Sequence, residues 1–284
     1  GGQDAFLIKF SSTGARLWAT YYGGVNSDNS YAAATDASGN VYLAGWTDSP
    51  TTTSIASGGF QNTYGGGTND AFLVKFSSAG IRQWGTYYGG SADDRGYMVA
   101  SDALGNVYLS GSTSSTGISS GGFQSIGGGG LDAFLVKFDA AGNRLWATYY
   151  GGVGGEYGYG LASDAVGNVY LAGNTTSNAN IASGGFDNNF GGGWDAFLIQ
   201  FNANTGARNW ATYYGGTGFD YGYSVVIEAA GNIYLSGQTA SNSSIASGGY
   251  DNTLGGSQDV FLAKFGVSGN LLWATYYGGP LAEE

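Results

Sequence analysis

Four acidic residues recur at one position of an internal repeat, and together they could do chemistry. Each follows a Gly-Gly pair by four residues; they are Asp28, Asp94, Glu156 and Asp220. If the repeats surround an axis, the four carboxylates would line the mouth of a channel. A ring of carboxylate oxygens suits a hard cation such as Ca²⁺, the one cofactor that the pattern suggests. Alternatively, each acid caps its own loop by accepting backbone N–H hydrogen bonds.

Aromatic and basic residues beside these acids form a second candidate site. Arg95, Tyr157 and Tyr221 each follow one of the acids, and Phe219 precedes Asp220. Exposed aromatic rings beside acids and amides are typical of sugar-binding surfaces, so these four residues predict a carbohydrate site. Alternatively, the rings pack over neighbouring loops. A hydrolase or lyase that uses a carboxylate pair, Glu156 with Asp220, is a further alternative.

Composition excludes several classes of protein. The 284 residues contain neither His nor Cys, which removes the Ser-His-Asp triad, disulfides and the commonest transition-metal ligand. The net charge of −11 argues against a nucleic-acid partner, because phosphates require a basic surface. No apolar run approaches the roughly 18 residues that a membrane-spanning helix needs, so membrane insertion is not expected.

The whole chain is built from one repeating unit. An aspartate opens a short apolar segment at Asp4, Asp70, Asp132, Asp195 and Asp259, giving repeats of 62–66 residues. Each copy ends in an aromatic run, such as Trp84-Gly-Thr-Tyr-Tyr-Gly-Gly90. A fixed period of this size indicates one supersecondary unit that packs on its neighbours.

One unit predicts four strands. They are expected at 31–36, 41–46, 71–76 and 83–88, with an Asp-x-x-Gly-Asn turn at 36–40 and with Asp70 capping the glycine turn before it. The segment 71–76 is apolar on both of its alternating faces, which predicts burial between stacked sheets. The fold class is therefore all-β, a β-propeller of four-stranded antiparallel blades with about 4.5 repeats.

The recurring elements resemble a known family. Asp70-Ala-Phe-Leu-Val-Lys-Phe76, Trp146-Ala-Thr-Tyr-Tyr-Gly-Gly152 and Gly39-Asn-Val-Tyr-Leu-Ala-Gly45 are similar to the bacterial seven-bladed β-propeller (SBBP) repeat. The resemblance implies a propeller on an exported or cell-surface bacterial protein. That family has no single activity, so the resemblance assigns no catalytic residue.

We expect a single domain over 1–284, consisting of a half-blade (1–24), blades at about 25–90, 91–152, 153–216 and 217–279, and a tail (280–284). The long loops share one face, which is expected to bind a protein or a glycan. The half-blade could pack as an incomplete blade, belong to a longer array, or pair with a second molecule. The leading hypothesis is a non-enzymatic scaffold in adhesion or assembly at the bacterial cell surface or outside the cell. A lectin-like module is the main alternative.

Overall fold

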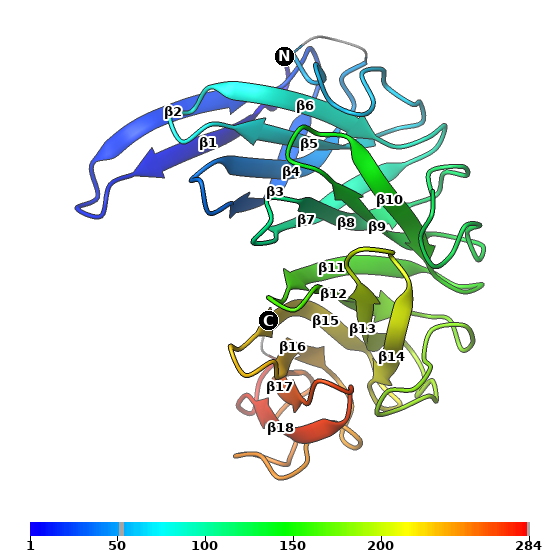
Figure 1. The fold of residues 1–284 in the computed structure, drawn as a ribbon. Coiled ribbons are helices and arrows are strands. Elements are labelled where there is room, and N and C mark those ends of the chain that lie inside the picture. Colours follow the sequence, from blue (N-terminus) through cyan, green and yellow to red (C-terminus); the bar gives the residue numbers. More distant parts are fainter. Residues whose placement is uncertain (51–53, 283–284) are drawn as a thin grey trace. The chain divides into compact units, whose positions relative to one another are not determined.

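The computed structural model describes residues 1–50 and 54–282, and these form only β-strands, turns and loops (Figure 1). A hairpin pairs β1 (Ala5–Phe10) with β2 (Arg16–Tyr22), and four antiparallel four-stranded sheets follow, each in sequence order. The last two residues of the expected tail, 283–284, lie outside the described part. The predicted fold class, an all-β propeller-type architecture of four-stranded antiparallel blades with about 4.5 repeats, is confirmed. The single domain over 1–284 stays a prediction.

The sixteen strands of the four blades have the following bounds. Blade 1 holds β3 (Asp28–Thr35), β4 (Val41–Thr47), β5 (Asp70–Phe76) and β6 (Arg82–Tyr88). Blade 2 holds β7 (Asp94–Ser101), β8 (Val107–Thr113), β9 (Asp132–Phe138) and β10 (Arg144–Tyr150). Blade 3 holds β11 (Glu156–Ser163), β12 (Asn168–Thr175), β13 (Asp195–Asn202) and β14 (Arg208–Tyr214). Blade 4 holds β15 (Asp220–Ile227), β16 (Ile233–Thr239), β17 (Asp259–Phe265) and β18 (Leu271–Tyr277).

The first hairpin of each blade closes as the sequence predicts. The Oδ1 atom of Asp36 accepts hydrogen bonds from the backbone N–H groups of Ser38 and Asn40, both at 3.0 Å. Its Oδ2 accepts a third from the side chain of Asn40 at 2.8 Å. Gly39 has φ 77°, a conformation that favours glycine. The Asp-x-x-Gly-Asn turn is therefore confirmed, and it fixes the register of β3 on β4.

The first strand of each blade starts earlier than predicted. It begins at the acid itself, because Asp28 pairs with Thr47 and extends the β3–β4 ladder by three residues. The prediction that the acids lie in loops was therefore wrong. Arg95, Tyr157 and Tyr221 consequently lie on strands β7, β11 and β15.

The contacts within the chain group into two compact units. Unit 1 comprises residues 1–120 and 134–148, and unit 2 comprises 121–133 and 149–284. In unit 1, β3 and β7, the first strands of blades 1 and 2, are in contact. In unit 2, β11 and β15 make the corresponding contact between blades 3 and 4. The same strand-to-strand packing therefore recurs inside each unit.

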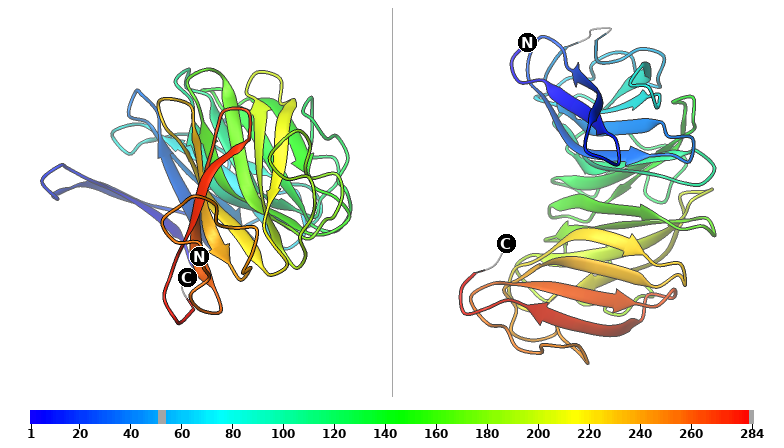
Figure 2. Two further views of the ribbon diagram at one scale, coloured as in Figure 1. Left: turned by 90° about the horizontal axis from the view of Figure 1, so that it is seen from below. Right: turned by 90° about the vertical axis from the view of Figure 1, so that its left-hand side faces the viewer.

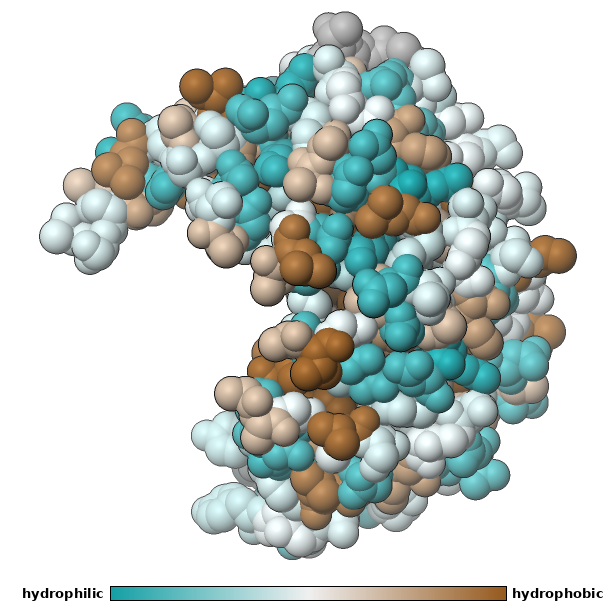
Figure 3. Space-filling view, in the orientation of Figure 1, coloured by the Kyte–Doolittle hydropathy of each residue, from teal (hydrophilic) through white to brown (hydrophobic). Residues whose placement is uncertain are grey.

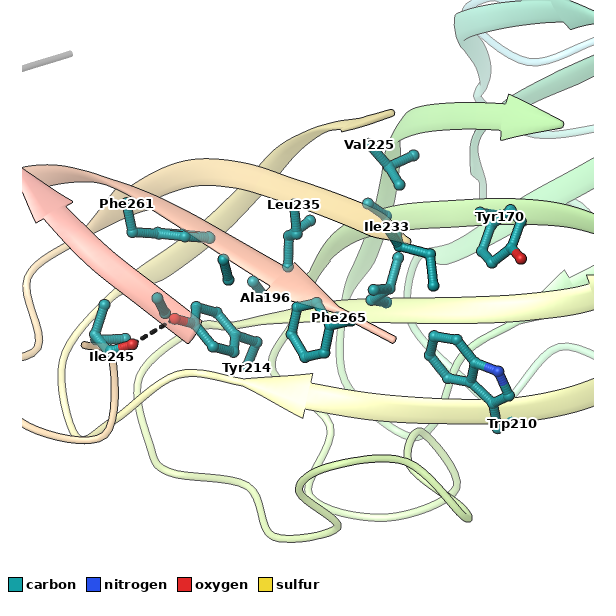
Figure 4. Packing of buried hydrophobic residues seen from close by; sticks show 14 of the residues in the cluster. Tyr170, Ala196, Trp210, Tyr214, Val225, Ile233, Leu235, Ile245, Phe261 and Phe265 are labelled. Carbon is teal, nitrogen blue, oxygen red and sulfur yellow. Dashed lines mark hydrogen bonds between the residues drawn. The ribbon is translucent and has the colours of Figure 1, made fainter. Parts of the chain in front are cut away.

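A tyrosine at the end of each fourth strand joins one blade to the next. In unit 2, the ring of Tyr214 lies 5.0 Å from that of Phe261 and 5.7 Å from that of Phe265. Its hydroxyl donates a hydrogen bond to the carbonyl of Ile245 (Figure 4). We call the tyrosine at the end of each fourth strand its knob tyrosine. We call the two phenylalanines of each third strand the phenylalanine pair. The knob tyrosines with a following blade, all buried, are Tyr22, Tyr88, Tyr150 and Tyr214.

The β1–β2 hairpin packs with one face only. Tyr22 and Ala5 are buried against blade 1, whereas Phe6 is 61% and Phe10 is 57% exposed. The far end of the hairpin projects beyond the first blade (Figure 2). Apolar side chains are visible on its outer surface in Figure 3. This strand pair therefore has the apolar sequence pattern of a complete blade, but the apolar side chains on one of its faces are exposed.

Candidate functional site

The four acids that follow the Gly-Gly pairs are buried, and each caps its own blade. In blade 2, Asp94 Oδ2 accepts hydrogen bonds from the Gly90 N–H (2.8 Å) and the Ser115 hydroxyl (2.7 Å). Asp94 Oδ1 accepts another from the hydroxyl of Thr113. A Thr hydroxyl and a Gly N–H donate in the same way to Asp28, Glu156 and Asp220. The alternative that each acid caps its own loop is therefore confirmed.

The electrostatics of these acids follow from their burial. Burial raises the pKa of Asp94, and the hydrogen bonds from Thr113 and Ser115 oppose that rise. Burial likewise raises the pKa values of Asp28 and Asp220. Three donors on one carboxylate favour its ionised form, so these acids serve as fixed acceptors that hold loop to strand.

The predicted calcium site consists of these same residues. Across residues 1–50 and 54–282, no group of three or more acidic side chains is placed to hold a metal ion. A cation at Asp28, Asp94, Glu156 or Asp220 would compete with hydroxyl and amide donors for the carboxylate oxygens. Calcium binding by this set stays a prediction. Glu156 and Asp220, the pair considered for hydrolysis, are each fully buried within their own blades.

A second set of buried acids begins the third strands. Asp70 Oδ2 accepts a hydrogen bond from the N–H of Gly65 at 2.6 Å, as predicted for a cap on the glycine turn. Asp132, Asp195 and Asp259 accept equivalent bonds in their blades. The Oδ1 atoms of Asp70 and Asp195, however, are buried without a hydrogen-bond partner. A buried orphan oxygen is costly, which distinguishes these two carboxyls from ordinary caps.

The two sets of acids meet as carboxyl pairs across a glycine. A Cβ atom on Gly89 would lie 2.7 Å from Asp70 Oδ1 and 2.7 Å from Asp94 Oδ2, so only glycine lets the two carboxyls approach. Gly215 lies in the same way between Asp195 and Asp220. Burial, with a contribution from the neighbouring carboxylate, raises the pKa of Asp70 to about 7 and that of Asp195 to about 7. Each pair therefore binds a proton up to neutral pH.

Unit 2 brings five aromatic side chains together, which we call the aromatic cluster: Tyr157, Tyr159, Trp194, Tyr221 and Tyr223. Tyr157 and Tyr159 are stacked, with ring centroids 5.6 Å apart and an interplanar angle of 2°. Tyr221 and Tyr223 are stacked on the neighbouring blade at 6.1 Å and 9°. Tyr159 and Tyr223 are the residues at which the β11–β12 and β15–β16 ladders shift register, so each stack forms at a bulge in the first strand of its blade.

Contacts between blades close the cluster into a continuous array. The rings of Tyr159 and Tyr223 are 5.8 Å apart. Trp194, which precedes β13, lies 5.7 Å from Tyr157 and 6.3 Å from Tyr221. Each of the five rings therefore contacts two others.

The predicted carbohydrate residues are only partly brought together. Tyr157 and Tyr221 belong to the cluster, through Trp194. Phe219 is 49% exposed and pairs with Trp194 through its backbone rather than its ring. Arg95 lies in unit 1, with its guanidinium 5.5 Å from the ring of Trp46 and paired with Asp93 at 3.0 Å.

Trp194, Tyr159 and Tyr223 are site residues that were not predicted from the sequence. A signal for Trp194 was present in the sequence. The residue before the third strand is Asn69, Leu131 and Gln258 in the other blades, and a bulky indole appears there only in blade 3.

Comparison with known proteins identifies a β-propeller repeat family. The family model described as a β-propeller repeat, SBBP, matches residues 17–50, 83–119 and 145–179. The regulatory protein FlaEY of Caulobacter vibrioides is 27% identical over 143 residues, which are 50% of this chain and 15% of that protein. An uncharacterized WD repeat-containing protein of Acanthamoeba polyphaga mimivirus is 24% identical over 354 aligned residues, spanning 100% of this chain and 25% of that protein. The chain thus spans a quarter or less of these relatives.

Among solved structures, the quinohemoprotein alcohol dehydrogenase of Comamonas testosteroni aligns with a TM-score of 0.33 and 11% identity. The alignment covers 84% of this chain and 52% of that one. Among the described residues, none forms a helix suited to crossing a membrane.

Proposed function

Since the chain is a β-propeller repeat protein of the SBBP family, we propose that it is a non-enzymatic scaffold whose partner is a further blade of its own kind. One observation carries the proposal: the apolar contacts that join blades are left uncovered on the outer faces of the first and last strand pairs. A blade of the same kind, whether from another part of the same protein or from a second copy of this chain, is the partner that fits those faces. A cell-surface or extracellular location, where such a scaffold would act in adhesion, is part of the proposal.

The face of β1–β2 is a receiving surface. In the complete blades the phenylalanine pair is buried by a knob tyrosine, as Phe72 and Phe76 are by Tyr22, at 5.0 and 6.1 Å. Phe6 and Phe10 occupy the same positions in β1 and are largely exposed. A hollow of about 280 Å³ lies on this face between Phe6, Ile8 and Arg16. A further knob tyrosine would fill that hollow.

The face of β18 carries an exposed knob tyrosine, the side chain that would cover the phenylalanine pair of β1. Tyr277 is the fifth knob tyrosine and is 73% exposed, whereas the other four are buried. Tyr250 is 94% exposed, although its counterpart Phe60 is covered by the guanidinium of Arg144 at 4.3 Å. In β2, Arg16 occupies the position that Arg144 occupies in β10. Tyr277 and Tyr250 therefore match the phenylalanine pair and Arg16 of a second copy.

The expected strength of this contact is modest. Complete burial of an exposed Phe or Tyr side chain contributes about 1.5–3 kcal/mol. Association costs about 4–15 kcal/mol, and the hairpin lacks the isoleucine carbonyl that accepts the tyrosine hydroxyl between complete blades. We therefore expect a head-to-tail dissociation constant in the micromolar to millimolar range, roughly 10 µM to 1 mM.

Light scattering after size-exclusion chromatography, over a concentration series, tests the proposal. The 284-residue chain is expected to exceed its 29.0 kDa monomer mass as concentration rises. Phe6→Gln and Tyr277→Gln should each abolish the increase, while a mixture of the two variants should form dimers only, since one intact interface remains. Leu104→Gln, at an exposed turn, is the matched control and should assemble normally. A constant monomer mass in the unmodified chain would contradict the proposal.

A further inference from the structure

The aromatic cluster of unit 2 is not a requirement of the repeat. At the positions of Tyr157 and Trp194, blade 1 has Asn29 and Asn69 and still folds into the same four-stranded sheet. In unit 1, Tyr31 and Tyr97 stand at the positions of Tyr159 and Tyr223, with ring centroids 5.7 Å apart, while Asn29, Arg95 and Asn69 stand at the positions of Tyr157, Tyr221 and Trp194. Blade packing alone therefore does not account for five contacting rings.

The cluster is accessible from solvent. Tyr223 is 47% exposed, and the other four rings are partly exposed. Rings from three segments thus form one amphipathic surface, which is the kind of surface that ligand sites use for stacking.

Amide side chains lie beside this surface. Asn174 pairs directly with Tyr157 across β11 and β12, and directly opposed residues of antiparallel strands project to the same face. Asn174 is only 2% exposed, and its Oδ1 has no hydrogen-bond partner. Gln238 holds the same position opposite Tyr221, with its Nε2 donating to Gln258 at 3.1 Å. A buried acceptor left open beside aromatic rings indicates a ligand that donates from a hydroxyl or an amide.

The charges of the surface narrow the ligand class. The aromatic cluster and the amides of Asn174, Gln238 and Gln258 include no acidic or basic residue. The neighbouring acids Glu156 and Asp220 are fully buried and bonded to Gly152 and Gly216. The chain carries a net charge of −11, which disfavours acidic polymers.

We propose that the aromatic cluster and Asn174 form a binding surface for a neutral oligosaccharide. The C–H faces of successive sugar rings stack on Trp194 and the tyrosine pairs, and a sugar hydroxyl donates to Asn174 Oδ1. The site uses side chains of β11, β12, β15 and the segment before β13, whereas the proposed assembly uses the faces of β1–β2 and β18. The two proposals are therefore independent.

Titration calorimetry on the whole 284-residue chain tests the site. The probes are cellohexaose, chitohexaose, laminarihexaose and maltohexaose, with hexagalacturonate as the acidic comparison and tetramethylammonium as the cationic one. We expect at least one neutral hexasaccharide to bind with a dissociation constant of about 1 mM or tighter. Trp194→Asn should weaken binding about tenfold or more, because indole side chains dominate such contacts.

The variants are chosen so that the fold persists. Trp194→Asn and Tyr157→Asn install the residues that blade 1 carries at the same positions, and circular dichroism checks folding. Tyr31→Ala removes an exposed ring outside the cluster and should leave binding unchanged. Failure of all four neutral probes to bind would overturn the proposal. So would sugar binding that both Asn variants leave intact, or binding of tetramethylammonium in place of sugars.

Discussion

The carboxyl pairs predict that this protein loses stability as the pH rises towards neutrality. Asp70 Oδ1 is buried without a partner and faces Asp94 across Gly89, and burial raises the pKa of Asp70 from 3.8 to about 7. An acid whose pKa is higher in the folded state binds its proton more tightly there. Its contribution to stability is complete below about pH 4 and is lost as the pH rises through 7.

The magnitude follows from the size of the shift. Each pKa unit corresponds to 1.36 kcal/mol, so a shift from 3.8 to about 7 sets an upper bound of about 4 kcal/mol. The interior responds with an effective dielectric constant well above that of dry protein, so we expect roughly 1–2 kcal/mol per pair. Asp195 should contribute a similar amount in unit 2.

The perturbation is Asp70→Asn, alone and with Asp195→Asn. The amide oxygen of asparagine can still accept the Gly65 N–H, and its NH₂ group can donate to the Asp94 carboxylate. Thermal unfolding at pH 8 should therefore shift upwards by about 3–6 °C per substitution, with little change near pH 4.5. The pH dependence between 5 and 8 should flatten in the double variant.

Asp139→Asn is the control, because it is expected to change the melting temperature at pH 8 in the opposite direction. Burial raises the pKa of Asp139, but hydrogen bonds from Asn143 outweigh it and lower the pKa overall. This acid therefore stabilises the fold above its unfolded pKa, and its replacement should lower the melting temperature at pH 8. Equal melting temperatures for the unmodified chain and Asp70→Asn across pH 5–8 would refute the reasoning about the pairs.

Three further predictions concern the same contacts. Gly89→Ala and Gly215→Ala place a Cβ within 3 Å of two carboxyls and should destabilise the chain by about 2 kcal/mol or more in urea unfolding; a change under about 0.5 kcal/mol would contradict the reported geometry. Tyr214→Phe removes the bond to Ile245 and should cost about 1 kcal/mol, whereas Tyr214→Ala should cost about 3–5 kcal/mol by the same assay; equal losses would show that ring packing is not the main term. Calcium at millimolar concentration should leave the melting temperature within error of that in EDTA, since the buried acids are already satisfied; a calcium-dependent rise would support the carboxylate-ring prediction.

The architecture could be predicted from the sequence alone because the same strand and turn patterns recur in every repeat. Segment 71–76 is apolar on both faces, and β5 is buried along its whole length. The Asp-x-x-Gly-Asn turn and the Asp70 cap are local, since partner and acceptor lie within about five residues. The start of β3 was misplaced because Asp28-Asn-Ser30 has turn-like composition, and only pairing with the distant Thr47 makes it a strand.

The site was harder to predict because its contacts join distant segments. Tyr157, Trp194 and Tyr221 come from three strands or loops, and no period in the sequence brings them together. The carboxyl pairs are non-local in the same sense, since Asp70 and Asp94 are joined only when Gly89 packs between them. Burial, which sets the pKa of these acids, is a property of the assembled blade and is not visible in composition.

The residues that repeat and the residues that depart from the repeat have different roles in this chain. Asp94, Gly89 and the knob tyrosines recur in the blades and are engaged in hydrogen bonds or packing that any blade needs. A residue that satisfies an obligatory contact has little freedom to bind anything else. Trp194 and Asn174 replace different side chains at their positions, and Asn174 keeps an open acceptor. In a protein of near-identical units, ligand specificity must therefore come from these departures, which is why the sugar titration examines Trp194 and not the acids.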